Sequence, residues 1–226
     1  MILVVNHTST FWGGEASLEK VLLAMSSEYE VYFLTPGGEL SNRLKEKINI
    51  IISHGIDRLN KSSNPIWIIK FIYQLFFSFF EVAWYISKIK PDVVHCFSET
   101  AAFYCVLPAK FMSKTIICQI HLVIIQSKFW ERVSIIIGKF VTRYIVISYA
   151  VKNRMVSIGH NSEKISVINS GTDTENEFNP KNVELGLFRQ KFDLLEKSFL
   201  VALIGSIQPL KGQHLFVQSI DILLRK

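Results

Sequence analysis

Residues 2–34 decide the fold and read ILVVNHTSTFWGGEASLEKVLLAMSSEYEVYFL. The apolar runs at residues 2–5 and 31–34 predict two short strands, and the amphipathic stretch between them predicts a helix over about residues 15–27. Because both strands are continuous apolar runs, we expect them to be buried on both faces, as in a parallel sheet.

This alternation of strands and helices continues to residue 168. Further strands are predicted at 48–52, 92–96, 115–120, 144–147 and 164–168, and helices at 39–47, 66–88, 99–112 (bent at Pro108), 128–141 and from 150 to about 159. Strands separated by helices indicate βαβ units. The predicted fold class is α/β, with a doubly wound parallel sheet in one domain over residues 1–170.

A second strand–loop–helix pattern occupies residues 200–215, LVALIGSIQPLKGQHL. An apolar strand predicted at 200–204 breaks at Gly205, and a loop brings Lys211 and Gly212 to the start of an amphipathic helix. Backbone N–H groups and an ammonium at a helix N-terminus favour an anion such as phosphate. We interpret residues 171–197 as an interdomain linker and 198–226 as the start of a second, nucleotide-binding domain.

Composition restricts the function less than the motifs do. The chain has 226 residues, is 49% hydrophobic and carries a net charge of +6. This basic excess is compatible with binding to anionic lipid, nucleic acid or phosphorylated ligands, and equally with an ordinary lysine-rich surface. Three cysteines in apolar runs (Cys96, Cys105, Cys118) predict buried free thiols in a reducing cytosol. We find no secretory leader and no uncharged run of about 20 apolar residues, and therefore expect a cytoplasmic protein.

Several residues are expected near the carboxyl ends of the strands, where open parallel sheets bind ligands. Gly13 and Gly14 would let a ligand approach the backbone, or else form a tight turn without a ligand. His95 and His121, with His7, are predicted at the cleft rim, where a histidine can donate to a sugar hydroxyl or a phosphate; a structural histidine is the alternative. Ser148 would cap the next helix or face the cleft.

Motifs for several other chemistries do not occur. No Gly-x-Gly-x-x-Gly accompanies the first strand, which counts against a nicotinamide or flavin dehydrogenase, and the loop before Lys211 is not a P-loop. Ser148 lies outside any Gly-x-Ser-x-Gly, so a hydrolase nucleophile is not expected. Histidine and cysteine spacing matches no zinc motif, and no nucleic-acid reader motif is present; we predict no metal site and no nucleic-acid partner.

Two helices suggest a further partner. The stretch 67–86 is apolar on every side, as in a helix that is deeply buried or that faces a membrane or a protein. Residues 128–143 combine lysine and arginine with aromatic residues at helical spacing, which is typical of peripheral contact with an anionic membrane, or of an ordinary outer helix with a solvated lysine face.

Taken together, these segments resemble the family 4 glycosyltransferases over almost the whole chain. The resemblance is carried by the glycine loop at residues 13–16, PDVVH at 91–95, the segment 148–152, VINSGTD at 167–173 with FNP at 178–180, and Ile204-Gly205 to Lys211-Gly212. It implies a Rossmann-like GT-B architecture, with an acceptor-side N-terminal domain and a C-terminal domain for the nucleotide.

The resemblance also implies a reaction. A sugar would pass with retention of configuration from a nucleotide-sugar donor to a glycan or lipid-linked acceptor, without a metal or other cofactor, in bacterial surface polysaccharide or lipid-linked glycan synthesis. Gly14 would admit the donor phosphate or sugar, His121 would contact the transferred sugar as the catalytic-site histidine, and Lys211 would neutralise the leaving diphosphate.

The sequence departs from the family pattern at three places. Ser206 stands where many members have an arginine, the segment from Asp173 to Phe178 is one residue longer, and no Glu-x7-Glu element follows Lys211. We therefore expect the chain alone to be inactive, as a truncated transferase or half of a two-chain enzyme. The alternatives are a non-catalytic module that binds acceptor or membrane, and, more distantly, an epimerase acting on the nucleotide sugar.

Overall fold

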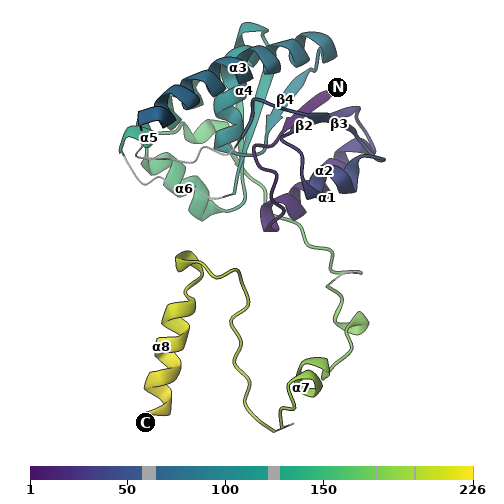
Figure 1. The fold of residues 1–226 in the computed structure, drawn as a ribbon, viewed down its shortest axis with the longest axis vertical. Coiled ribbons are helices and arrows are strands. Elements are labelled where there is room, and N and C mark those ends of the chain that lie inside the picture. Colours follow the sequence, from purple (N-terminus) through teal and green to yellow (C-terminus); the bar gives the residue numbers. More distant parts are fainter. Residues whose placement is uncertain (58–64, 122–127, 177, 196, 226) are drawn as a thin grey trace. The chain divides into compact units, whose positions relative to one another are not determined.

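A computed structural model describes residues 1–57, 65–121, 128–176, 178–195 and 197–225 (Figure 1). The chain divides into two compact units, Met1–Gly171 and Thr172–Lys226. The further division of the second unit into a linker and the start of a domain stays a prediction.

The first unit is built on a seven-stranded sheet in which every neighbouring pair is parallel, in the order β3-β2-β1-β4-β5-β6-β7. The strands are β1 Ile2–Val5, β2 Val31–Thr35, β3 Asn49–Ile52, β4 Val93–Cys96, β5 Thr115–Ile120, β6 Arg143–Val146 and β7 Ile165–Val167. Each predicted strand of this unit forms, within two residues of its expected bounds, which confirms the doubly wound α/β fold.

Helices cover both faces of this sheet (Figure 1). They are α1 Gly13–Ser26, α2 Glu39–Leu44, α3 Pro65–Ile89, α4 Glu99–Phe111, α5 Lys128–Phe140 and α6 Tyr149–Ser157. Successive strand side chains point to opposite faces, and this alternation divides the core into two clusters. Val4 packs with Leu18 and Leu22 of α1, whereas Leu3 and Val5 belong to the cluster that includes α3 and α4.

Local sequence explains several of the helix boundaries. Ser98 and Ser148 begin α4 and α6 as N-caps, each accepting a hydrogen bond from the backbone N–H three residues later. Helix α4 continues through Pro108 to Phe111.

The three cysteines are free and buried, as the apolar runs predicted. Among the described helices, none is both long and apolar enough to cross a bilayer.

The second unit differs from the expectation in one element. It contains α7 Leu187–Lys191 and α8 Gln213–Leu224, and the predicted helix after Gly212 is present. The strand predicted at 200–204 is wrong: these residues have no ladder partner, and Ile204 is 95% exposed. A parallel strand is stable only between hydrogen-bonded neighbours, and the described residues of this unit contain no other strand to supply them.

Candidate functional site

The carboxyl ends of β1 and β4 lie side by side, although the chain between them forms two strands and three helices. This is the point where the strand order reverses, and ligands of open α/β sheets bind there. The loop that follows β1 is held in place by a buried asparagine: the amide N–H of His7 donates to Asn6 Oδ1 at 2.9 Å. Gly38 leaves room for this loop, since its φ is +101° and a Cβ there would approach the Ser9 carbonyl oxygen to 2.0 Å.

The ends of β1 and β4 are also joined through side chains. His7 Nδ1 and Ser98 Oγ are 2.9 Å apart, and Ser98 Oγ accepts from the Ala101 N–H at 2.9 Å. The serine that caps α4 therefore also fixes the orientation of His7. Phe97 continues the β1–β4 ladder, with its N–H donating to the Val5 carbonyl at 2.9 Å.

His121 follows β5 and is positioned by two neighbours. The Phe97 ring lies 4.6 Å from the imidazole between centroids, and Gln119 Nε2 lies 3.2 Å from His121 Nε2. Burial lowers the pKa of His121, so the ring is neutral at physiological pH. A neutral imidazole offers one donor and one acceptor, which suits contact with an uncharged sugar hydroxyl.

His95 does not lie at the rim of the cleft, where it was expected. It is the third residue of β4, is 5% exposed and lines a cavity of about 330 Å³ on the α1 face of the sheet, together with Ser17, Gln119 and Asn169. Its Nε2 has no partner among the described residues, and burial, partly offset by Gln119, lowers the pKa of His95 to about 4. The reason is register, because strand β4 ends one residue later and its side chains alternate between faces.

Gly13 and Gly14 form the first turn of α1 and lie beside open space. A Cβ added to either would meet no atom within 4 Å. The fold itself thus leaves room for a side chain at both positions, and the same room is open to a ligand at the helix N-terminus. Glu15 is buried in this turn, where its carboxylate accepts from the Trp12 N–H at 3.2 Å.

The other expected site residues are placed as follows. Ser148 caps α6, since its Oγ accepts from the Val151 N–H at 3.3 Å. Gly205, Lys211 and Gly212 belong to the second unit, where Lys211 is exposed at the end of a short 3-10 turn, Pro209–Lys211. Gly212 has φ +74° and begins α8, and Gln213 holds the loop by donating from Nε2 to the Ser206 carbonyl at 2.7 Å.

Sequence reasoning missed Phe97, Ser98 and Gln119 as parts of this site. The signal available was position. Ser98 directly precedes a predicted helix, and Gln119 lies in a predicted strand two residues before His121, which follows it, a spacing that repeats a face along extended backbone. Within residues 1–57, 65–121 and the other described segments, no group of three acidic, histidine or cysteine side chains could hold a metal ion.

Several solved structures are similar to this chain. Anabaena HepE in complex with UDP aligns with TM-score 0.74 and 16% identity over 97% of this chain, and a glycosyltransferase from Rickettsia africae aligns with TM-score 0.74 and 21% identity over 100% of it. The chain spans 57% of the length of each of these two proteins. A UDP-N-acetylglucosamine 2-epimerase from Rickettsia bellii aligns with TM-score 0.57 and 14% identity, over 86% of this chain and 51% of its own.

These likenesses confirm the Rossmann-like α/β fold, in agreement with the GT-B architecture that the family resemblance implied. No curated protein matches the sequence. The model of Glycosyltransferase Family 4 matches residues 13–176, a range that begins at the glycine pair of α1 and includes Phe97, Ser98 and His121 but not His7. Because the match covers most of the chain, the chain belongs to glycosyltransferase family 4.

Proposed function

We propose that this chain takes part in retaining transfer of a sugar from a nucleotide-sugar donor to a glycan or lipid-linked acceptor in the assembly of surface polysaccharide. The observation that carries the proposal is the joined carboxyl edge of β1, β4 and β5, where His7 meets Ser98 and Phe97 packs on His121, together with the open first turn of α1, the helix that follows β1. Membership of family 4 supports the reaction class.

Each group at this edge has a chemical task in the proposal. The N-terminus of α1 favours a phosphate or a partly negative sugar oxygen, and Gly14 leaves space for it. Neutral His121 binds a hydroxyl of the transferred sugar. In the second unit, Lys211 would stabilise the negative charge that develops on the leaving diphosphate. None of these steps needs a metal ion or another cofactor.

We further propose that the chain by itself does not turn over a donor. The second unit holds α8 but, in its described residues, no strand on which a nucleoside site could be built. A complementary half, in the same or another chain, would supply that site. The three buried free thiols suit a reducing compartment, so we place the reaction in the cytoplasm at the inner face of the membrane.

The proposal is tested with the purified chain, UDP-glucose and other labelled nucleotide sugars, and a membrane extract as acceptor. We expect saturation-transfer NMR to detect binding of a nucleotide sugar or an acceptor, weakened by His121→Ala, with no UDP released by the chain alone. Release of UDP by the chain alone would contradict its inactivity and keep the transferase assignment. Binding of neither ligand class would refute the proposed function, and an altered sugar formed without an acceptor would identify an epimerase instead.

A further inference from the structure

Helices α3, α4 and α5 expose an apolar surface that the sugar-transfer site does not use. The α3–α5 face is defined here by exposed side chains of these three helices: Ile69, Ile72, Tyr73, Phe76, Phe77, Phe80, Trp84, Leu107, Phe111, Ile136 and Phe140. Most are more than half exposed, and Phe111 reaches 78%. Contiguous apolar surface of this kind is uncommon on a monomeric protein and marks a binding surface.

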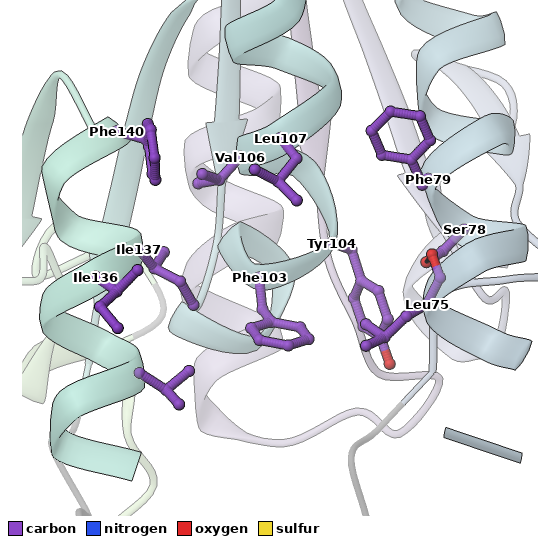
Figure 2. A pocket seen from close by; sticks show the side chains of 11 residues that line it. Leu75, Ser78, Phe79, Phe103, Tyr104, Val106, Leu107, Ile136, Ile137 and Phe140 are labelled. Atoms are coloured by element: carbon purple, nitrogen blue, oxygen red, sulfur yellow. Dashed lines mark hydrogen bonds between the residues drawn. The ribbon is translucent and has the colours of Figure 1, made fainter. Parts of the chain in front are cut away.

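The face is continuous across the helices because a groove joins them. Figure 2 shows the side chains that line it: Leu75 and Phe79 of α3 lie on one side, Ile136, Ile137 and Phe140 of α5 on the other, and side chains of α4 between them. The cavity measures about 260 Å³. Phe79 also packs edge-on against Phe111, with ring centroids 6.2 Å apart, so the groove and the exposed face meet.

The groove offers hydrocarbon surface to a ligand and no unsatisfied polar group. Its two polar side chains are Ser78 and Tyr104. Ser78 Oγ donates to the Leu75 carbonyl at 3.0 Å. The Tyr104 hydroxyl donates to the Asp57 carbonyl at 3.0 Å and accepts from Gln74 Nε2 at 3.0 Å. An occupant of the groove must therefore be apolar.

The charges of the same three helices have one sign toward solvent. Each helix carries a single acidic residue, and each of the three has a partner within this unit. Glu81 accepts from Ser53 Oγ and the Gly55 N–H at 2.6 and 2.9 Å, Glu99 is bonded to Ser134, and Glu131 forms a partly exposed ion pair with Arg154 at 2.9 Å. The exposed basic residues Lys88, Lys110, Lys128, Arg132 and Lys139 form no ion pair with any residue that the structure describes.

We propose that the α3–α5 face binds the surface of an anionic lipid bilayer, with its basic residues on phosphate headgroups and an acyl chain packed in the groove. An apolar surface edged with cations is complementary to this one partner. A second copy of the chain fits less well, because a two-fold interface would bring like charges together. The inference is separate from the sugar-transfer reaction, and its test uses no sugar donor.

The first test measures binding of the full chain to phosphatidylcholine vesicles with and without phosphatidylglycerol, by flotation. We expect binding to the anionic vesicles, weakened by salt. Arg132→Glu with Lys139→Glu should lower the partition coefficient about 30-fold or more, since each basic residue near an anionic surface contributes about fivefold. The control, Lys45→Glu with Lys47→Glu, changes the net charge equally at exposed residues near the end of α2 and should retain binding.

A second pair of variants separates apolar from electrostatic contact. Phe76 and Phe80 are exposed and pack edge to face, with centroids 4.7 Å apart. Phe188 of α7 and Phe192, which directly follows α7, form a matched exposed pair at 4.6 Å, called here the α7 pair. Phe76→Ser with Phe80→Ser should reduce vesicle binding, whereas the same change in the α7 pair should not. Because all four rings are exposed, circular dichroism should show both variants folded.

A third measurement locates the inserted surface. Lipids brominated on the acyl chain should quench the fluorescence of Trp84, which lies on the face beneath the Lys88 ammonium, 4.8 Å from the ring. The chain has four tryptophans, so Trp84→Phe should keep vesicle binding and reduce the observed quenching. The proposal is overturned if the face variants and the control variants lose vesicle binding equally, or if brominated lipids cause no quenching. It is also overturned if the chain forms a lipid-free dimer that the Phe76 and Phe80 changes abolish, and that outcome would assign the face to a second copy.

Discussion

Replacing Gly14 by alanine or valine should separate the stability of the fold from its function. A Cβ at this position meets no atom within 4 Å, and Gly14 has no positive φ. Alanine there should therefore stabilise the first unit by about 0.4–1 kcal/mol, because it reduces the freedom of the unfolded chain. For a unit of this size the melting temperature should rise by about 1–4 °C.

Ligand affinity should fall in the Gly14 variants, although the stability of Gly14→Ala should rise. The added methyl group of Gly14→Ala occupies the space that we assign to a phosphate or sugar, and the larger side chain of Gly14→Val fills more of it. We expect at least a 10-fold loss of nucleotide-sugar or acceptor affinity for alanine, where one displaced contact of about 1.4 kcal/mol is enough, and a larger loss for valine. Calorimetric unfolding and ligand titration are measured on the same samples.

Gly38→Ala serves as the contrasting control. Its Cβ would approach the Ser9 carbonyl to 2.0 Å at a φ of +101°, so this variant should be destabilised by more than Gly14→Ala is stabilised. Unchanged ligand affinity in both Gly14 variants, with the Gly38 variant destabilised as expected, would refute the assignment of a ligand to the α1 N-terminus.

Three further predictions concern charge and protonation. In a full-length or reassembled enzyme, Lys211→Ala should lower the transfer rate roughly 10²-fold or more, and near wild-type turnover would contradict its proposed role. The pKa of His95 is lowered from 6.5 to about 4, so its contribution to stability is present above pH 6.5 and is lost as the pH falls toward 4. The free energy of unfolding should fall by about 3 kcal/mol over that range, and the same titration of His95→Gln should be flatter. Ser134→Ala should cost about 1–3 kcal/mol in urea unfolding, because Glu99 and His160 then lose the hydroxyl that they share; a neutral effect would show that neither depends on it.

Much of the first unit could be predicted because its signals are local. A continuous apolar run such as β1, followed by glycine and an amphipathic helix, specifies a buried parallel strand and a crossover without reference to distant residues. Serine directly before a helix predicted the Ser148 cap of α6 for the same reason. The strand expected at 200–204 failed because a strand, unlike α8, depends on neighbours from elsewhere in the chain.

The sequence by itself therefore determined the alternation of elements, the parallel sheet and the glycine-led helix at its carboxyl edge. Only the tertiary structure decided which side chains share that edge: it joined His7 to Ser98 across 91 residues, set Phe97 against His121 and buried His95 within β4. It also left the apolar side of α3 exposed, whereas the sequence allowed a buried or an exposed helix. The physical reason is that hydrophobic periodicity is encoded in neighbouring residues, while register and strand order fix which distant side chains meet.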